Sequence, residues 1–312
     1  MSGVRSSKHC ALLLLASSLA LAVACGGGAA GPAAQSADGA DANGETTGPR
    51  EKPAASTGIE SLAALREKLK SPPGKELDLA GKGFGAELGT VLGGAATLEG
   101  VEKLDASDND LGADGARGLL ASSHLSTLSA LDLGGNEIGD AGADALAGSE
   151  LPRLSTLNLS GNGIGSAGAK ALAKGKGYPA LSSLDLSMNP IGADGVKALS
   201  ALGKLSALFL LGSEIGADGA KALAKGSFKL KVLALSGNSI GDDGAKALAA
   251  SSKLSSLATL DLSANGIGDA GAKALAASPH LKSLTKLEMF ANDLSAAGKG
   301  ALSKRFGDAV KL

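Results

Sequence analysis

A G-x-G-x-x-G motif occurs twice in the sequence, at residues 163–168 and 266–271. In each case an acidic residue, Asp185 or Glu288, lies 22 positions after the first glycine. Glycines at this spacing between a strand and a helix, with an acidic residue about 20 positions later, are typical of dinucleotide-binding βαβ units. The last two glycines, however, recur at a regular spacing throughout the chain. A repeat explains them, and nucleotide binding is not predicted.

Two further patterns resemble binding sites but lack required residues. Residues 165–170 read Gly-Ser-Ala-Gly-Ala-Lys, without the Gly-Lys-Ser/Thr core of a phosphate-binding loop. Asp105, Ser107 and Asn109 alternate like the oxygen ligands of a calcium loop. The glycine needed at the sixth position of such a loop and the glutamate at the twelfth are both replaced. Neither pattern predicts a site.

Catalytic residues are not predicted either. The two cysteines, Cys10 and Cys25, both lie near the N-terminus, far in sequence from His124 and His280. The rest of the chain therefore lacks a thiol nucleophile or a cysteine metal ligand. No nucleophile–base pair, metal-binding cluster or isolated carboxylate pair is found. We expect no enzyme activity, no metal, no cofactor and no small-molecule substrate.

The motifs discussed above all lie in copies of one sequence repeat. One copy runs Leu128, Leu131, Asp132, Leu133, Asn136, Ile138, Gly139, Gly142, Ala143, Leu146. We number nine units by the residue at the asparagine position, which is Lys82, Asn109, Asn136, Asn162, Asn189, Ser213, Asn238, Asn265 and Asn292. These positions are spaced by 27, 27, 26, 27, 24, 25, 27 and 27 residues. A period of this length predicts a stacked-repeat architecture.

Each unit reads as one short strand and one short helix. Residues 131–133 alternate apolar and polar side chains, which fits a strand with one buried face. Residues 134–136 then break the strand. Gly139 and Asp140 indicate a helix start, where Asp140 would cap free N–H groups. One unit cannot bury its apolar face alone, so stacking builds the core.

Over residues 75–303 the copies resemble leucine-rich repeats of the long, ribonuclease-inhibitor-like subtype. The resemblance implies an α/β solenoid, a curved horseshoe with short parallel strands on its concave face and helices on its convex face. It also implies that the recurring asparagine is structural, because an amide that both donates and accepts can satisfy backbone groups beside the strand. These asparagines are Asn109, Asn136, Asn162, Asn189, Asn238, Asn265 and Asn292.

The outward strand position between the two core leucines is acidic in most units. It reads Asp78, Asp105, Asp132, Asn158, Asp185, Phe209, Ala234, Asp261 and Glu288. Neighbouring strands in a sheet lie about 4.8 Å apart, so these residues should form an acidic stripe. Neighbouring like charges repel, and we expect that nothing in folding requires this row of acidic residues. Their presence therefore favours a role in charge-selective binding. A solvated polar face without a partner is the alternative.

Unit six interrupts the stripe with apolar residues. It presents Ala207, Phe209 and Leu211 outward, and unit seven adds Val232 and Ala234. Apolar clusters rimmed by polar residues often mark contact sites. The alternative is that these side chains are covered locally. The residues expected to bind a partner on the concave face are Asp105, Asp132, Asp185, Phe209, Leu211, Val232, Asp261, Glu288 and Phe290.

The N-terminus resembles a bacterial export signal. Residues 1–24 combine a basic start with an apolar run of 14 residues at 11–24, too short to span a bilayer comfortably. Residues 22–24, Ala-Val-Ala, followed by Cys25 resemble a lipobox, in which Cys25 is lipidated. The family prefers leucine where Ala22 stands. Ordinary signal cleavage and a retained signal remain alternatives.

The segments next to the repeats are expected to be a linker and two caps. Residues 26–58 hold no Leu, Ile, Val or Phe, so residues 25–58 should be a lipid-anchored disordered linker. Residues 59–74 should form an N-terminal cap with a helix at 59–70, started by a capping box at Thr57. An amphipathic helix lying on a membrane is the alternative. Residues 304–312 should form a C-terminal cap with a last strand at 309–312.

The charge balance gives no reason to expect nucleic acid. Without residues 1–24 the chain has 28 basic and 31 acidic side chains, a net charge of −3. Nucleic-acid binding rests on clustered cations, which this balance does not supply.

These observations predict a non-catalytic protein-binding scaffold, lipid-anchored in the bacterial cell envelope, with an unidentified protein partner. Gly26 stands where many inner-membrane lipoproteins carry aspartate, which favours the outer membrane; secretion is the second choice. One alternative is a GTPase-activating or inhibitor-type regulator, because ribonuclease inhibitor and Ran GTPase-activating protein share the subtype. The outward strand positions carry no arginine, and an exported chain would not meet a cytosolic GTPase. Another alternative is a structural envelope spacer.

Overall fold

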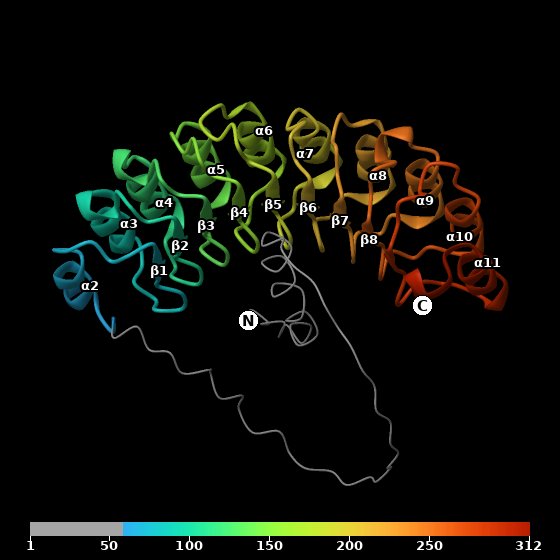
Figure 1. Cartoon of the computed structure of the whole chain (residues 1–312), viewed down its shortest axis with the longest axis horizontal. Helices are drawn as coiled ribbons and strands as arrows, with labels where there is room; N and C mark the ends of the chain where they lie inside the picture. Colours follow the sequence, from blue (N-terminus) through green and yellow to red (C-terminus); the bar gives the residue numbers. More distant parts are fainter. Residues whose placement is uncertain (1–58) are drawn as a thin grey trace, which may run out of the picture. The chain divides into compact units, whose positions relative to one another are not determined.

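The computed structural model describes residues 59–312, drawn in colour in Figure 1. The predicted signal at residues 1–24, lipidation at Cys25, the linker at residues 25–58 and the capping residue Thr57 all lie outside the described residues. Residues 59–312 belong to one compact unit. The core described below is made of that unit's own residues, so we expect it to fold by itself.

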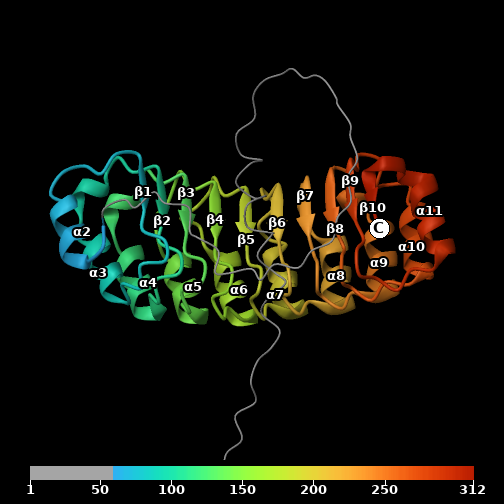
Figure 2. The same ribbon diagram turned by 90° about the horizontal axis from the view of Figure 1, so that it is seen from below.

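The strands form one parallel sheet in chain order (Figures 1 and 2). They are β1 Glu76–Asp78, β2 Lys103–Asp105, β3 Ala130–Asp132, β4 Thr156–Asn158, β5 Ser183–Asp185, β6 Ala207–Phe209, β7 Val232–Ala234, β8 Thr259–Asp261, β9 Lys286–Glu288 and β10 Val310–Lys311. Equivalent residues of successive units pair in register, for example Leu104 with Leu131. The middle leucine of each strand from β1 to β9 is buried, so the strand residues on either side of it face away from the core.

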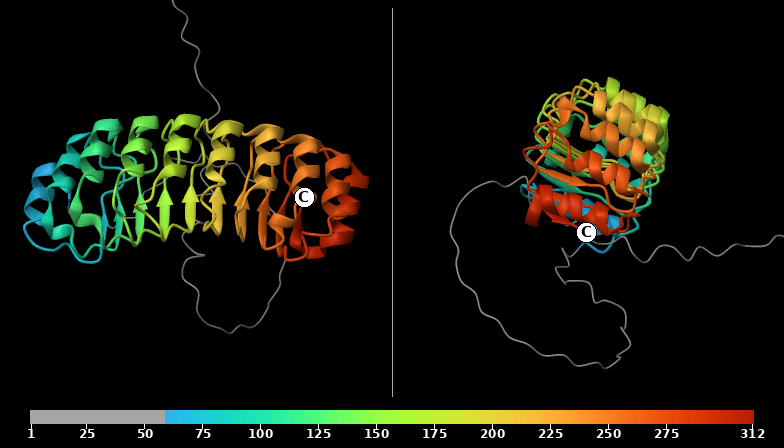
Figure 3. Two further views of the ribbon diagram at one scale, coloured as in Figure 1. Left: turned by 90° about the horizontal axis from the view of Figure 1, so that it is seen from above. Right: turned by 90° about the vertical axis from the view of Figure 1, so that its right-hand side faces the viewer.

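Helices α3 to α11 each follow a strand and line the outer side of the arc, whereas α2 precedes β1 and lies at the N-terminal end (Figures 1 and 3). They are α2 Leu62–Lys68, α3 Glu87–Gly93, α4 Gly112–Leu120, α5 Gly139–Ala147, α6 Ser166–Lys174, α7 Gly192–Leu199, α8 Gly216–Lys225, α9 Gly241–Ala249, α10 Asp269–Ala276 and α11 Ala296–Phe306. Short 3₁₀ turns are η1 Ala96–Leu98, η2 Ser123–Leu125, η3 Ser252–Leu254 and η4 Gly307–Ala309. The described residues thus form the predicted curved α/β solenoid, with parallel strands on the concave face and helices on the convex face.

The core is a continuous stack of leucine layers. In unit three, Leu128, Leu131 and Leu133 are each at most 1% exposed. Small residues let neighbouring helices approach closely. A Cβ added to Gly89 of α3 would lie 1.9 Å from the carbonyl oxygen of Gly115 in α4. The high glycine content and the low aromatic content therefore allow successive units to pack closely against one another.

The N-terminal helix is shorter than predicted. It begins at Leu62 instead of Ile59, because the Ser61 hydroxyl accepts the N–H of Ala64 at 3.1 Å and sets the start. Ile59 lies before the helix and is still buried. At the other end, β10 supplies the strand expected within residues 309–312. Among residues 59–312, no helix has the length and hydrophobicity needed to cross a bilayer.

Candidate functional site

The recurring asparagines hold the concave edge of the stack in place. Asn136 is fully buried, and its Nδ2 donates to the carbonyl oxygens of Leu133 and, one unit earlier, Ala106, both at 2.9 Å. Its Oδ1 accepts the N–H groups of Asn109 and Leu111 at 3.0 and 3.3 Å. One side chain thus satisfies backbone groups of two units, which fixes where each strand ends relative to its neighbour.

The same bonds recur in the other units. Corresponding amide-to-carbonyl bonds to the preceding unit are made by Asn109, Asn136, Asn162, Asn189, Asn238, Asn265 and Asn292. Ser213 replaces the asparagine in unit six, and its hydroxyl donates to the Leu186 carbonyl at 3.2 Å. The N–H of Asn189, which an asparagine amide in unit six would accept, has no hydrogen-bond partner among residues 59–312. The row of asparagine side chains that links successive units, which we call the asparagine ladder, is therefore interrupted at unit six.

The parallel strands run side by side along the concave surface (Figure 2), and their outward positions form three columns across the strands. The first strand residue gives the first column, the third strand residue gives the second column, and the position two residues later gives the third. The second column is the predicted acidic stripe. The third column reads Ala80, Ser107, Gly134, Ser160, Ser187, Leu211, Ser236, Ser263 and Phe290. The register pairing places each column in a line across the strands.

The acidic stripe has a structural role that its sequence did not reveal. Asp132 Oδ1 accepts the N–H of Gly134 at 2.9 Å, and Asp185 Oδ1 accepts that of Ser187 at 2.8 Å. Asp78, Asp105, Asn158 and Asp261 make the same bond to the residue two positions on. Such bonds are typical of aspartate and asparagine at turns. The expectation that nothing in folding requires these residues is therefore wrong.

Several stripe carboxylates are partly withdrawn from water. Burial raises the pKa of Asp132 to about 6, although hydrogen bonds from Gly134 and Asn158 oppose the shift. The charges of Asp105 and Asp185 add to the increase. Burial also raises the pKa of Asp185 and of Asp261. A cation placed against these carboxylates would relieve the cost of their burial.

The ends of the concave face are less acidic than the sequence suggests. Glu288 pairs with Lys286 of its own strand at 3.1 Å. Glu76 pairs with Lys103 of the next strand at 2.7 Å. Asp105, Asp132, Asp185 and Asp261 have no ion pair within 4.0 Å among the described residues. The stripe carboxylates without an ion pair thus lie on β2, β3, β5 and β8.

An apolar patch divides this charge. Ala207, Phe209 and Leu211 fill all three columns of unit six; they are half-buried and lie outside the leucine core. Val232 continues the first column, in register with Ala207. Met188 lies beside them, since its N–H donates to the Leu211 carbonyl at 2.6 Å and its side chain is 46% exposed. We call these five residues the unit-six patch.

Met188 was not among the predicted site residues. It occupies the position before the recurring asparagine, where all nine units have a positive φ; at Met188 φ is 59°. Glycine holds that position in five units, because it adopts this conformation without strain. The sequence signal that could have identified Met188 was a large apolar residue at a repeat position that glycine usually occupies.

Phe290 does not join the unit-six patch. It is 47% exposed at the C-terminal end of the third column, on the unit of β9. Three strand spacings separate β9 from β6, about 14 Å. The structure therefore gathers Phe209, Leu211 and Val232 but leaves Phe290 as a separate exposed ring.

The glycine motif at residues 163–168 is explained by packing between helices. A Cβ on Gly168 would lie 2.6 Å from Oδ1 of Asp140. This oxygen accepts the N–H groups of Gly165 and Gly168 at 2.7 and 2.8 Å. Asp140 therefore caps α6 of the next unit and not, as predicted, its own helix α5, which has no side-chain cap. The N–H groups at the start of α6 thus bind the carboxylate of Asp140, where those of a dinucleotide-binding unit would bind a phosphate.

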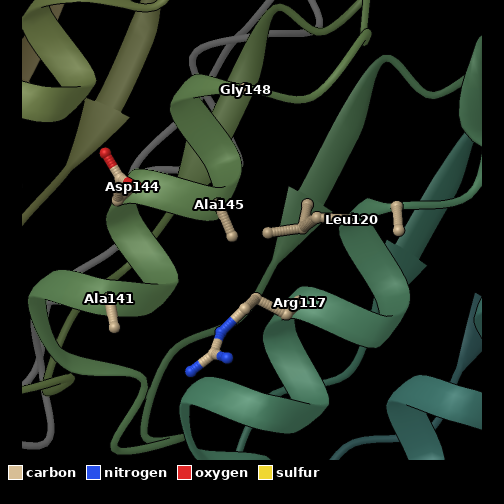
Figure 4. Close-up of a pocket in the computed structure, with 7 residues that line it drawn as sticks. Arg117, Leu120, Ala141, Asp144, Ala145 and Gly148 are labelled. Atoms are coloured by element: carbon tan, nitrogen blue, oxygen red, sulfur yellow. The ribbon is translucent and has the colours of Figure 1, made fainter.

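A shallow groove of about 530 Å³ lies on the convex face between α4 and α5 (Figure 4). Leu120 and Ala145 point toward one another across it, and Arg117 extends toward α5 (Figure 4). The Arg117 guanidinium is in an ion pair with Asp114 of its own helix at 3.1 Å. The groove has small apolar walls and its cation is compensated, so the concave face is the stronger candidate site.

Within residues 59–312, no three acidic, histidine or cysteine side chains are grouped so that they could hold a metal. His124 Nδ1 lies 3.0 Å from Glu99 Oε1, in a pair on the surface. His280 is distant in sequence and has no such partner among the described residues.

Comparison with known proteins concerns the repeats. Residues 124–147, 152–173, 180–200, 226–249 and 253–276 match a family model described as Leucine Rich repeat. A crystal structure of an internalin (inlF) from Listeria monocytogenes is similar, with a TM-score of 0.42 and 16% sequence identity over 79% of this chain and 88% of that chain. None of the curated proteins matches the sequence. Five segments of the chain thus match leucine-rich repeats, and residues 59–312 form a curved α/β solenoid of stacked strand–helix units.

Proposed function

We propose that this protein is a non-catalytic scaffold that binds a protein partner on its concave face, centred on the unit-six patch. The repeats are of the ribonuclease-inhibitor-like subtype, and the chain is anchored in the bacterial cell envelope through a lipid on Cys25. Leucine-rich repeat solenoids present an extended concave surface that suits a folded or extended protein segment.

The observation that carries this proposal is the loss of polarity in all three columns at one unit. Elsewhere the second and third columns are mostly aspartate and serine, which suits a surface in water. In unit six the corresponding residues are Phe209 and Leu211, beside the exposed Met188. Exposing these side chains costs hydration free energy that a partner would recover by covering them.

A crosslinking pull-down from an envelope extract of the source organism tests the proposal. The bait is residues 26–312, which contain the whole solenoid, beside the same bait with Phe209→Glu and Leu211→Glu. A matched control carries Thr156→Glu and Ser160→Glu, which add the same charge to the concave face two strands away. Circular dichroism and thermal unfolding establish that all three baits are equally folded.

The proposal predicts a protein that the unchanged bait and the control capture and the patch variant loses. Equal capture by all three baits would remove the unit-six patch from the binding site. Absence of capture under several extraction conditions would favour a spacer role, in which the concave face binds nothing.

The lipid anchor is tested separately. Cells expressing the full chain are labelled with radioactive palmitate, and the protein is recovered with and without Cys25→Ser. The proposal predicts label on the unchanged protein, recovery in the membrane fraction, and loss of both in the variant. Unlabelled protein in the medium would indicate ordinary secretion instead.

A further inference from the structure

We propose that the segment bound at the unit-six patch is cationic and amphipathic, with one bulky apolar side chain flanked on both sides by lysine or arginine. The inference rests on the proposed function and specifies the partner's chemistry. It follows from what surrounds the patch on the same face.

Carboxylates that form no ion pair among residues 59–312 flank the patch on both sides. Asp185 pairs in register with Phe209 itself, one strand toward the N-terminus. Asp261 lies in the same column on the far side, beyond Ala234. Lys286 on the next strand is in an ion pair with Glu288, and its charge lowers the pKa of Asp261 without forming an ion pair with that carboxylate. A partner that covered the patch would therefore meet negative charge in both directions along the stack.

The strand spacing fixes the distances involved. Asp185 is one strand from Phe209, about 5 Å, and Asp261 is two strands away, about 10 Å. An extended chain advances about 3.3 Å per residue. A segment lying across the strands would place one cation one or two residues from its apolar anchor, and the other about three residues away on the opposite side.

Charge argues against other occupants. A second copy of the chain would bring the same acidic column against this one, and like charges opposed across an interface disfavour association. An acidic or phosphorylated segment would meet the same repulsion. A neutral apolar segment would cover the patch and leave the partly buried carboxylates without an ion-pair partner.

The chain itself supplies a substitution that removes the charge and keeps the fold. Asn158 occupies the acidic column in unit four, and its Oδ1 accepts the N–H of Ser160 at 2.9 Å. Asparagine therefore makes the turn bond that aspartate makes. The charge variant is Asp185→Asn with Asp261→Asn, and the patch variant is Phe209→Ser with Leu211→Ser.

The test selects peptides without assuming their sequence. A phage library of random 12-residue peptides is panned against residues 26–312 in low salt, with the patch variant as the subtraction control. Enriched peptides are synthesised with a fluorophore, and their dissociation constants are measured by anisotropy for the unchanged protein and both variants. Light scattering on the same samples measures self-association.

We expect enriched peptides to carry lysine or arginine on both sides of a large apolar residue. Their affinity should fall at least tenfold in the charge variant and at least tenfold between low and physiological salt. Enriched peptides without cations, bound equally by the charge variant, would overturn the inference and leave a binding patch in place. Absence of enrichment, or self-association of the protein through this face, would overturn it as well. The pull-down result is independent of each of these outcomes.

Discussion

At the scale of single residues, the asparagine ladder is the main polar device in the stack. Asn136 satisfies donors and acceptors in two units while fully buried. Removing such a side chain leaves buried backbone groups without partners, which costs more than the bonds themselves contribute.

Replacement of Asn136 by alanine is expected to lower the free energy of unfolding by about 3 kcal/mol or more, because several buried groups lose partners at once. Urea unfolding followed by circular dichroism measures the loss. The matched variant is Asn292→Ala, in the last unit, where the side chain is partly exposed and water can replace it. Similar losses at both positions would contradict a role that depends on burial.

The pKa of Asp132 gives a prediction about pH. Its folded pKa of about 6 exceeds the reference value of 3.8, so the folded state binds more protons between these values. This group's contribution to stability is therefore present in acid and is lost as pH rises from about 4 to about 6. The shift corresponds to a free-energy change of about 1 to 2 kcal/mol, allowing for partial exposure.

Asp132→Asn removes this titration and retains an acceptor oxygen for the Gly134 N–H. Between pH 4.5 and 7, the free energy of unfolding should therefore fall less in the variant than in the unchanged protein. Urea unfolding at several pH values measures the difference. Parallel curves for the two proteins would show that Asp132 ionises normally in the folded state.

At the scale of elements, the strands and helices could be predicted from sequence because each unit repeats one apolar pattern. Leu131 and Leu133 marked a strand, and β3 ends between them at Asp132. The start of α2 was predicted too early, because Ser61 competes with Thr57 as a capping residue within four positions. Local pattern locates an element better than it locates its ends.

The cap that Asp140 provides to α6 could not be predicted, because its partners Gly165 and Gly168 lie 25 and 28 residues away. The same arrangement recurs where Asp242 accepts the N–H groups of Gly268 and Gly271, both at 2.8 Å. Contacts between units depend on the superposition of successive turns, which sequence spacing alone does not specify.

Asp140→Ala is therefore expected to loosen α6 more than α5. The loss of an N-terminal cap costs about 1 kcal/mol. Hydrogen exchange measured by mass spectrometry should show faster exchange at the start of α6, with α5 unchanged. Asp144→Ala, on the exposed face of α5, is the matched control and should change neither helix. Faster exchange confined to α5 would mean that Asp140 caps its own helix.

The candidate site was predictable only in part, for reasons visible in particular residues. The outward positions of Phe209, Leu211 and Val232 followed from the strand period. The exposure of Met188 did not, because it depends on a left-handed backbone conformation in the loop. The turn bonds made by Asp132 and Asp185 were also missed. Aspartates that recur at this position look the same in the sequence whether they serve as surface charges or as acceptors for the backbone N–H of a turn.

At the scale of the whole solenoid, the repeats present a long, mostly polar face whose outward columns are all apolar only at unit six. Figure 1 shows the strands lining the inner side of the arc across all the units. Unit six lies near the middle of this face, where a partner could contact strands on both sides. The irregular asparagine ladder at Ser213 falls in the same unit. The unit with the most apolar outward surface is thus also the unit in which the asparagine is replaced.

The central claim is that a protein partner contacts the unit-six patch, and photocrosslinking in living cells tests it most directly. Phe209 is replaced by the photoreactive amino acid p-benzoylphenylalanine, which keeps an aromatic ring at this position. Ala141, exposed on the convex helix α5, is replaced in a parallel strain as control. We predict that irradiation yields a specific adduct from position 209 and none from position 141. An adduct from position 141 without one from position 209 would contradict the proposed site.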